Sequence, residues 1–494
     1  MLARLTARLP AERSERAALG ALVLVLVAGL GLRLWLTVSV RPALIGYADS
    51  YVYIGAAIGP LFGDPLRPMG YAVFLRWLHD LNANLSFTIV AQHALGLASA
   101  VLLYLAARRV GVSRWWSLLP AAVVSLAGPQ ILIEHAPLTD SLFVFLQAAA
   151  LYAAARAAGE RDWAWALAAG AFAGASATVR ALGVFLVGAL VLCLLAAPAA
   201  RWRRRLVRGG AVLLAALVPL GFYVFEQDRQ SGYTGLTPAG SWNLYGRVAP
   251  FADCDRFDPP EGTRRLCQSK PEDERPGPNS YIFDPRQSPA IKAFGTPFEA
   301  TQEQSDMVAR FARTALVHQP LDLLDHVVTE DFVRYYSADR AARVGAGLGY
   351  DGLRETLVSG FQKPYTALRI SQYYTTSGEL FRAGRFDAFS SYEAATRVSG
   401  LVFVVLALLA VAAPFLAPRD LRRGAWLFLA VALIGVLGPL FTLFFDARYA
   451  IPAYGPLAAA AAVGGMGITR LVADRTRAGA APGASSAPIS RAPS

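Results

Sequence analysis

Apolar segments of membrane-spanning length recur along the chain. They fall at roughly 17–40, 86–107, 116–134, 140–158, 163–179, 181–199, 209–226, 396–417, 424–445 and 449–469. A helix of about 20 apolar residues crosses a hydrocarbon core of about 30 Å. The pattern therefore predicts an all-α, polytopic membrane bundle of about ten transmembrane helices, although the boundary at 179–181 also allows a re-entrant pair.

Short loops on one side of this predicted bundle are rich in arginine. They hold Arg108, Arg109, Arg114, Arg156, Arg161, the stretch RWRRRLVR at 201–208, Arg419, Arg422, Arg423, Arg470, Arg475 and Arg477. Cytoplasmic loops of membrane proteins carry such an excess of basic residues. We therefore expect an integral, multi-pass protein of the plasma (cell) membrane with both termini in the cytoplasm.

This topology leaves two long segments outside the cytoplasm. The predicted organisation is an N-terminal transmembrane region (1–226) that includes an external loop (41–85), a smaller extracytoplasmic domain (227–395), C-terminal transmembrane helices (396–469) and a disordered cytoplasmic tail (470–494). The extracytoplasmic domain begins with stretches rich in Gly, Pro and Asp, and then shows apolar residues at helical spacing. We expect it to be mainly helical and irregular.

The cysteines divide between the membrane region and the extracytoplasmic domain. Cys193 lies inside an apolar segment, as a small core residue would. Cys254 and Cys267 lie in the extracytoplasmic domain, where oxidising conditions favour a disulfide bond. Two unpaired thiols are the alternative.

Composition narrows the classes of function. Of the 494 residues, 55% are hydrophobic and 17% are charged, whereas about a quarter are charged in ordinary soluble domains. A formal net charge of +12 would suit nucleic-acid binding, but most arginines lie in the short loops, where they set orientation. We expect membrane lipids around the protein and no nucleic-acid partner.

Ionisable residues of both signs gather at the predicted outer ends of the helices and in the adjoining loops. They are Arg33, Asp49, Asp64, Arg67, Glu134, His135, Asp140, Arg180, Asp446 and Arg448. Charge at this depth is costly unless it is paired or faces water, which makes such residues functional candidates. The layer predicts a cavity that binds a charged ligand from outside. The alternative is a set of interfacial ion pairs that hold the loops together.

Asp49 is the main catalytic candidate. It follows the first apolar segment and precedes the short stretch YVYIGAAIG, with Tyr47, Tyr51 and Tyr53 close to it in sequence. A partly shielded carboxylate can accept the proton of an attacking hydroxyl group. The alternative is an N-cap, in which the carboxylate accepts backbone N–H bonds from the following helix.

Arginines are candidates for binding a phosphate group. Arg67 precedes Pro68 and an apolar helix, Arg180 lies between two apolar segments, and Arg448 opens the last apolar segment beside Asp446. A guanidinium group offers several donors to phosphate oxygens and is weakly hydrated. Alternatively, Arg67 anchors its loop to lipid headgroups, and Arg448 and Arg180 are ion-pair partners of nearby acids.

The stretch EHAPLTDSLFVFL places Glu134, His135 and Asp140 in one external turn. These side chains are further candidates for the cavity, as are Asp64, Asp446, Tyr51 and Tyr53. Asp140 would alternatively cap the helix that follows it. One His with two acids is a weak signal for a metal ion, so no metal site is assigned.

Four motifs together resemble the GT-C superfamily of integral membrane glycosyltransferases. They are YADSYVYIGAA in the first external loop, LRPMGYAVFL after it, LTDSLFVFLQAAALY in the next external turn and ARYAIPAYGPL at the last apolar segment. Their order and common side of the membrane are similar to the branch of protein O-mannosyltransferases and lipid A aminoarabinose transferases. The likeness covers nearly the whole chain except 227–395, where HQPLDLLDHVVTEDFVRYY alone is similar.

The resemblance implies a GT-C-like bundle and an inverting transfer of a sugar from a polyprenyl-phosphate donor to an acceptor hydroxyl group at the outer face. Asp49 takes the position of the family's general base. Arg67 takes that of the basic residue that holds the donor phosphate, with Arg448 as a second contact. Many members carry a second acid where this chain has Ser50, which leaves Asp49 alone. We expect no cofactor or divalent metal to be required.

A transporter or flippase of lipid-linked sugars is the alternative from another class. It predicts charges near the bilayer midplane and interrupted helices in corresponding halves, whereas here the charges lie at the outer face and no internal repeat is visible. An oligosaccharide polymerase or ligase would also use polyprenyl-linked donors. The transferred sugar stays open, as does the choice among glycan, glycolipid and protein acceptors.

Overall fold

The computed structural model describes residues 2–44, 49–62, 67–159, 163–196, 201–237, 239–335, 372–375, 386–398 and 400–479. Within these ranges every regular element is a helix, which confirms the predicted all-α fold class. Six helical stretches of the described residues are long and apolar enough to cross a membrane. They lie in α1 (Leu2–Ser39), α4 (Leu85–Val110), α7 (Thr139–Gly159), α10 (Trp202–Ser231), α21 (Arg422–Thr442) and α22 (Ile451–Gly479) with the preceding 3₁₀ turn η5 (Ala447–Ala450).

Shorter apolar helices lie among these long ones. They are α8 (Ala164–Val179), α9 (Gly183–Leu195) and α20 (Gly400–Leu416), and each coincides with a predicted apolar segment. With 13 residues, α9 rises only about 20 Å, which is less than a hydrocarbon core of about 30 Å. The number of complete spans therefore stays a prediction.

The prediction of one helix over 116–134 is wrong. The segment forms α5 (Leu118–Leu126) and α6 (Gly128–Glu134), separated at Ala127, whose backbone is extended with ψ of 120°. Pro129 stands in the first turn of α6. Because proline has no N–H group, it cannot continue the hydrogen bonding of α5, and a new helix begins instead.

Glycines let α8 and α10 cross at close range. A Cβ atom on Gly170 would lie 2.1 Å from the carbonyl oxygen of Val212, and one on Gly174 would lie 2.3 Å from that of Ala216. The two glycines are four residues apart and face the same neighbour, as in the small-residue interfaces of membrane helices. This contact fixes the end of α8, from which Arg180 follows.

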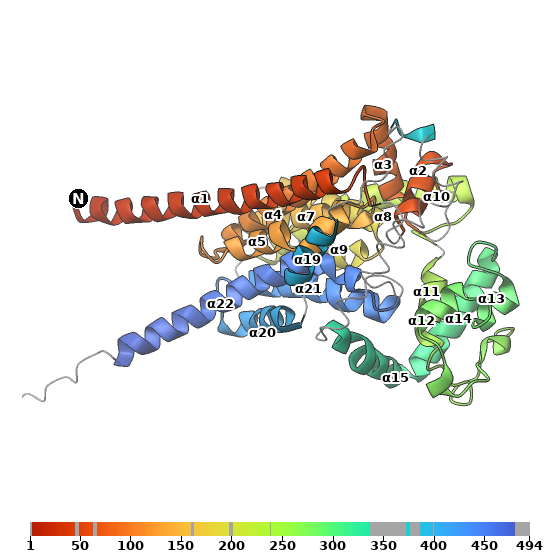
Figure 1. Ribbon diagram of the computed structural model, residues 1–494. Coiled ribbons are helices and arrows are strands. Elements are labelled where there is room, and N and C mark those ends of the chain that lie inside the picture. The colour runs from red at the N-terminus through yellow and green to blue at the C-terminus, as the bar shows by residue number, and fades with distance from the viewer. Residues whose placement is uncertain are drawn as a thin grey trace, which may run out of the picture.

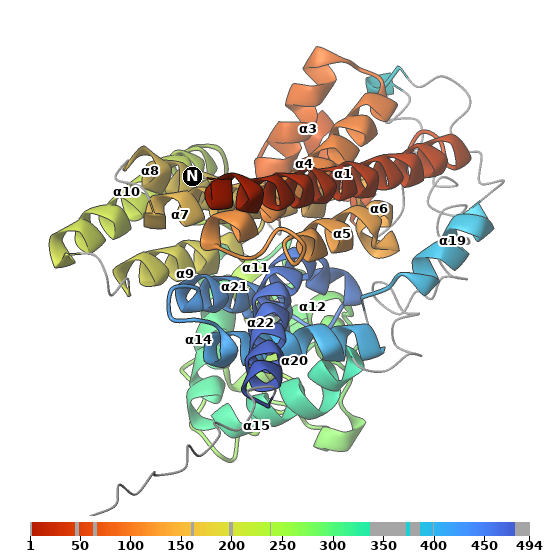
Figure 2. The same ribbon diagram turned by 90° about the vertical axis from the view of Figure 1, so that its left-hand side faces the viewer.

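The long helices run side by side as one bundle, with a cluster of short helices at one end (Figure 1). The N-terminal end of α1 and the C-terminal end of α22 project from the opposite end, so both lie on the same side of the bundle (Figure 1). Viewed from that side, α1 and α4 lie above α20, α21 and α22 (Figure 2). The short helix α5 packs against α1, α4 and α22 and joins the two groups.

The cluster of short helices is built around α11 and α14. Its elements are α11 (Ala239–Val248), α12 (Pro278–Phe283), α13 (Pro289–Phe294), α14 (Gln302–His318) and α15 (Pro320–Asp325), with 3₁₀ turns at Arg264–Leu266 and Glu272–Glu274. Trp242 of α11 is buried and donates its Nε1–H to Ser305 Oγ of α14 (3.2 Å). A disulfide bond joins Cys254 to Cys267 in the connection between α11 and α12.

The segment 320–335, in the part of the extracytoplasmic domain where apolar residues have helical spacing, is only partly α-helical. After α15 the chain continues as a π-helix (His326–Asp331) and a 3₁₀ turn (Phe332–Tyr335). The buried ion pair between Arg247 and Asp331 ties this stretch to α11. Tyr335 then stacks on Phe403 of α20 at a ring distance of 5.5 Å, which joins the cluster to the membrane bundle.

The predicted disordered tail begins too early. Helix α22 continues to Gly479, so the first ten positions of the tail, 470–479, are helical, and residues 480–494 lie outside the described residues. The sequence TRLVADRTRA holds no Gly or Pro and favours a helix beyond the apolar part. Low apolar content alone does not end a helix, because adding residues to an existing helix is easier than starting a new one.

Candidate active site

Two short helices follow α1 in the segment 41–85. Helix α2 (Ser50–Ile58) is joined to α3 (Gly70–Leu81) by Arg76, whose guanidinium group donates to the carbonyl oxygens of Ala57 and Gly59. These bonds satisfy carbonyl groups at the end of α2, which a helix leaves without partners. The tie fixes α2 against α3, and with it the residues that precede each helix.

Asp49 stands at the N-cap position of α2 but does not act as a side-chain cap. Its side chain makes no capping hydrogen bond, and the N–H groups of Val52 and Tyr53 bond instead to its backbone carbonyl oxygen (2.9 and 3.1 Å). Of the two alternatives drawn from the sequence, side-chain capping is therefore not the one observed. The carboxylate is turned toward arginines.

Two guanidinium groups hold the Asp49 carboxylate. Arg67 Nη2 lies 2.8 Å from Oδ1, and Arg448 Nη2 lies 3.7 Å from Oδ2. The Asp49 side chain is 34% exposed, whereas those of Arg67 and Arg448 are 16% and 7% exposed. Residues from the segment 41–85 and from the turn η5 before α22 thus meet at one point, with the acid still partly exposed.

The charge of Asp49 is set by a balance. Burial acts to raise the pKa of its carboxyl group, and the positive charges of Arg67 and then Arg448 act to lower it. The arginines outweigh burial, so the pKa lies below the ordinary value of 3.8. At neutral pH this group is a carboxylate.

A second ion pair lies beside the first. Arg180, directly after α8, pairs with Asp140 in the first turn of α7. The Tyr449 ring stands between the two groups, with its centroid 5.4 Å from the Arg180 guanidinium carbon and 5.0 Å from that of Arg448. The three arginines predicted to bind phosphate therefore belong to one contiguous cluster.

One N–H group of Arg448 has no acceptor among the residues that the structure describes. Asp446 Oδ1 accepts the backbone N–H of Arg448 (3.0 Å), and its Oδ2 lies 3.9 Å from Arg448 Nε, beyond hydrogen-bond reach. Arg448 Nε is buried and has no hydrogen-bond acceptor in the described part of the chain. A buried donor without an acceptor is uncommon in folded proteins, which makes this N–H group a candidate for binding an anionic ligand.

The remaining candidates in the segment 41–85 differ in position. Tyr53 is buried and meets Tyr71 edge-on at a ring distance of 5.3 Å. Burial, and next the charge of Asp49, raise the pKa of Tyr53, so it stays a neutral hydroxyl group. Tyr51 is 44% exposed. Asp64 lies outside the described residues.

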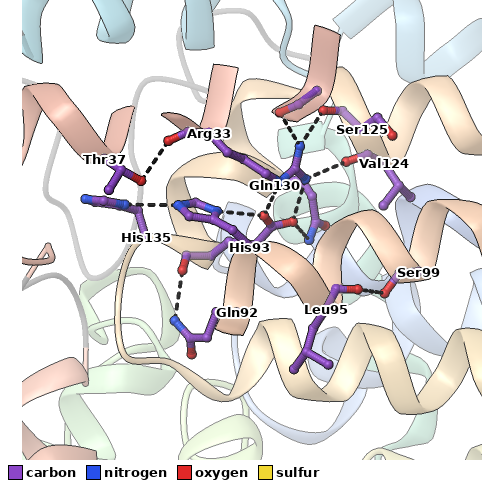
Figure 3. A network of polar contacts seen from close by, with 12 residues as sticks. Arg33, Thr37, Gln92, His93, Leu95, Ser99, Val124, Ser125, Gln130 and His135 are labelled. Atoms are coloured by element: carbon purple, nitrogen blue, oxygen red, sulfur yellow. Dashed lines mark hydrogen bonds and ion pairs between the residues drawn. The ribbon is translucent and has the colours of Figure 1, made fainter. Parts of the chain in front are cut away.

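Glu134 and His135 belong to a different cluster from Asp140. Glu134 pairs with Arg33 of α1 and with His93 of α4, and His93 in turn bonds to His135 (Figure 3). The one external turn predicted to line a single cavity thus divides between two clusters. The reason is the end of α6, which directs Glu134 and His135 back between α1 and α4, whereas Asp140 begins α7.

His93 is a buried polar residue that the sequence analysis missed. It lies in the predicted apolar segment 86–107, next to Gln92, in the run TIVAQHALG. A His–Gln pair inside an apolar span is itself a signal, because polar groups are retained there only where partners satisfy them. Among the described residues, no three His, Cys, Asp or Glu side chains are arranged to hold a metal ion, and the predicted lack of a metal requirement stays untested.

The family model for dolichyl-phosphate-mannose-protein mannosyltransferases matches residues 83–225 of the chain. This match confirms the resemblance to GT-C membrane glycosyltransferases that the motifs indicated. It runs from α4 into α10 and includes Asp140 and Arg180, whereas Asp49, Arg67 and Arg448 lie outside it. No curated protein matches the chain by sequence.

Solved structures show a loose likeness to the chain. The S. cerevisiae protein O-mannosyltransferase Pmt1-Pmt2 complex bound to the sugar donor is 18% identical, with a TM-score of 0.36 over 47% of this chain and 36% of that one. The oligosaccharyltransferase AglB from Archaeoglobus fulgidus, with an inhibitory peptide and a dolichol-phosphate, is 14% identical (TM-score 0.45, 95% of this chain, 52% of that one). ArnT from Cupriavidus metallidurans bound to undecaprenyl phosphate is 17% identical (TM-score 0.32, 93% and 80%). The chain thus spans 36% and 52% of the first two proteins.

Proposed function

We propose that this protein is an inverting glycosyltransferase that moves a sugar from a polyprenyl-phosphate donor to an acceptor hydroxyl group at the outer face of the membrane. The observation that carries the proposal is the Asp49 carboxylate held between Arg67 and Arg448 at one end of a bundle of apolar helices. The anionic head of a lipid-borne phosphate would lie at this end of the bundle, with its lipid tail along the apolar helices. The family that matches residues 83–225 is named for a dolichyl-phosphate-mannose donor, which supports the same class of donor.

The arginine cluster is suited to the phosphate of such a donor. Arg67 and Arg448 share one carboxylate, Arg180 is joined to Arg448 through the Tyr449 ring, and the buried Nε–H of Arg448 has no acceptor among the described residues. A phosphate oxygen would accept that N–H group, and guanidinium groups bind phosphate with more than one donor. The donor phosphate would therefore bind among arginine side chains that are already held in position.

In the proposed reaction, Asp49 is the general base. The acceptor oxygen attacks the anomeric carbon of the sugar while its proton passes to a carboxylate oxygen of Asp49. The bond from the anomeric carbon to the phosphate oxygen breaks, and polyprenyl phosphate leaves with the electron pair. The arginine cluster stabilises the negative charge that develops on the leaving phosphate. One displacement of this kind inverts the configuration at the anomeric carbon.

The same arginines link donor binding to the strength of the base. Without the donor, Arg67 and Arg448 hold the carboxylate and keep the pKa of Asp49 low. A donor phosphate competes for their N–H groups and adds negative charge beside the carboxylate, so the pKa of Asp49 rises. Asp49 becomes a stronger base only where a sugar is ready for transfer.

The proposal also assigns sides and partners. The site would lie outside the cytoplasm, with both termini inside, as the arginine-rich short loops favour. The segment 227–395, which includes the cluster of short helices from α11 to α15, would select a glycan, glycolipid or protein acceptor. The lipid-linked donor and that acceptor are the substrates, and neither a cofactor nor a metal ion takes part.

The direct test is transfer of a radiolabelled sugar from polyprenyl phosphate in membranes that contain the protein. We expect Asp49→Asn to lower transfer at least 100-fold, because general-base catalysis contributes about 10²–10⁴-fold. Asp80→Asn is the matched control, because Asp80 is a 69%-exposed acid on α3 whose loss removes the same charge outside the site. It should keep the wild-type rate.

Two results would contradict the proposal. Equal transfer by Asp49→Asn and the wild type would remove Asp49 as the base. Movement of a lipid-linked sugar across the membrane by the wild type, without transfer from any such donor, would favour a flippase instead.

A further inference from the structure

A buried polar array connects α1, α4 and α6 (Figure 3). Arg33 Nε and Nη2 donate to Glu134 Oε2 and Oε1 at 2.7 and 2.9 Å. Glu134 Oε2 lies 3.0 Å from His93 Nδ1, and His93 Nε2 lies 3.1 Å from His135 Nδ1. The exposure of these residues ranges from 0% to 5%. The proposed transfer chemistry uses none of them.

The far end of this array holds the chain segment that leads to Asp49. The Nε2–H of His135 donates to the carbonyl oxygen of Val40 (2.8 Å). The carbonyl oxygen of His135 accepts the N–H of Leu44 (2.9 Å). Val40 and Leu44 are buried, and Asp49 stands five positions after Leu44. One residue thus fixes the segment 40–44 at both ends, five positions before the proposed base.

The array also decides which nitrogen of His135 carries the proton. A carbonyl oxygen only accepts, so the bond to Val40 needs a proton on His135 Nε2. His135 Nδ1 is then an acceptor, and the bond from His93 supplies its proton from Nε2. His93 is held in this orientation by Glu134, and because its Nε2–H points to His135, the 3.0 Å contact between His93 Nδ1 and Glu134 Oε2 requires a second proton on the ring or on the carboxyl group. The proton that His93 Nε2 donates therefore matches the tautomer of His135 that the bond to Val40 needs.

The backbone around His135 is held as well. Gln92 Nε2 donates to the carbonyl oxygens of Glu134 and Ala136, each at 2.8 Å. These bonds fix the residues on both sides of His135. The hydroxyl group of Tyr71 donates to Gln92 Oε1 (2.5 Å), and the Tyr71 ring packs on Tyr53 beside Asp49. The support of His135 and the surroundings of Asp49 are thus parts of one connected structure.

We propose that His135 is a positioning residue for Asp49: it clamps the segment 40–44 through its ring and its backbone, and the Arg33–Glu134–His93 array keeps it in the tautomer that the clamp needs. The inference deepens the proposed function and rests on it, since a positioned base matters only if Asp49 accepts a proton. A base displaced by a fraction of an ångström lowers the rate of the chemical step more than it lowers binding. We therefore expect kcat, rather than donor affinity, to respond to His135.

The experiment combines backbone exchange with kinetics in the full-length protein in nanodiscs. Hydrogen exchange at the Leu44 amide and single-turnover transfer are compared in the wild type, His135→Leu, His135→Gln and His79→Leu. His79 is the matched control, because its Nε2 also bonds a backbone carbonyl, that of Tyr373 (2.8 Å). His135→Leu should speed exchange at Leu44 at least 10-fold and lower the transfer rate at least 10-fold, with donor affinity within twofold. His135→Gln, which keeps a donor, should recover part of both, and His79→Leu should change neither.

The two readouts separate failure of this inference from failure of the proposed function. Exchange is measured without donor, so it reports on the clamp even if the wild type transfers no sugar. Unchanged exchange and transfer in a folded His135→Leu protein, while Asp49→Asn is inactive, would overturn the inference alone. Equal effects of His135→Leu and His79→Leu would also overturn it, because the loss would then be general.

Discussion

The pKa of Asp49 is set by two opposing effects: its arginine neighbours and its burial. Burial raises the pKa of its carboxyl group, and Arg67 and Arg448 lower it by a larger amount. The group therefore stays ionised well into the acid range in the donor-free protein. The pKa of a carboxylate held in this way depends on what else the arginines bind, which is the basis of a pH experiment.

The pH dependence of transfer should differ between kcat/KM and kcat. The acid limb of kcat/KM reports the free enzyme, so we expect it below the ordinary pKa of 3.8, with a flat profile through weakly acidic pH. The acid limb of kcat reports the donor complex, and it should lie at higher pH because the phosphate has taken up the arginines. Initial rates at several donor concentrations across the pH range give both limbs.

The stability of the donor-free protein should follow the same sign. Because the folded pKa lies below 3.8, the stabilisation from this ion pair is complete above that value and is lost as pH falls through the lower pKa.

An acid limb of kcat/KM near neutral pH that Asp49→Glu shifts would contradict the account of the charge balance.

Close contacts between helices make room for the buried ion pair of Arg33 and Glu134. A Cβ atom on Gly96 of α4 would lie 1.9 Å from Glu134 Oε1, and one on Gly29 of α1 would lie 2.9 Å from the carbonyl oxygen of Ser125 and 3.2 Å from Arg33 Nη1. A larger residue at either position would drive the ion pair apart. The two glycines thus make room for the Arg33–Glu134 pair between α1, α4 and α6.

Gly96→Ala should destabilise the protein. Overpacking costs about 1–3 kcal/mol, and a displaced Glu134 would add to it because a broken buried pair costs about 3–5 kcal/mol. Gly188→Ala on α9 is the matched control, since nothing lies within 4 Å of a Cβ atom there. Thermal unfolding in detergent should show a lower midpoint for Gly96→Ala and an unchanged or slightly higher one for Gly188→Ala. Equal midpoints for Gly96→Ala and the wild type would show that Glu134 can relax.

At the scale of the molecule, the helices were predictable and their interruptions were not. Apolar length gave the long helices because a hydrocarbon core demands it. The break at Ala127 depends on how α5 and α6 pack against helices far away in sequence, and the continuation of α22 to Gly479 depends on local propensity that composition hides. Neither can be read from hydropathy alone.

The candidate site was also only partly predictable from the sequence. Topology and the resemblance placed Asp49, Arg67 and Arg448 on one side of the membrane, and the structure brings them within ion-pair distance. The separation of Glu134 and His135 from Asp140 depends on the angle between α6 and α7, which no spacing in the sequence specifies. The partner of both residues, His93, was visible as a polar residue in an apolar span.

The central claim is that a donor phosphate and the Asp49 carboxylate compete for the same arginines. The most direct test is the equilibrium affinity of purified wild type and Asp49→Asn for a polyprenyl-phosphate sugar. We expect the variant to bind the donor more tightly than the wild type, by severalfold, while it transfers no sugar, because the amide no longer occupies Arg67 and Arg448. Weaker donor binding by Asp49→Asn, with Asp80→Asn unchanged, would contradict the account.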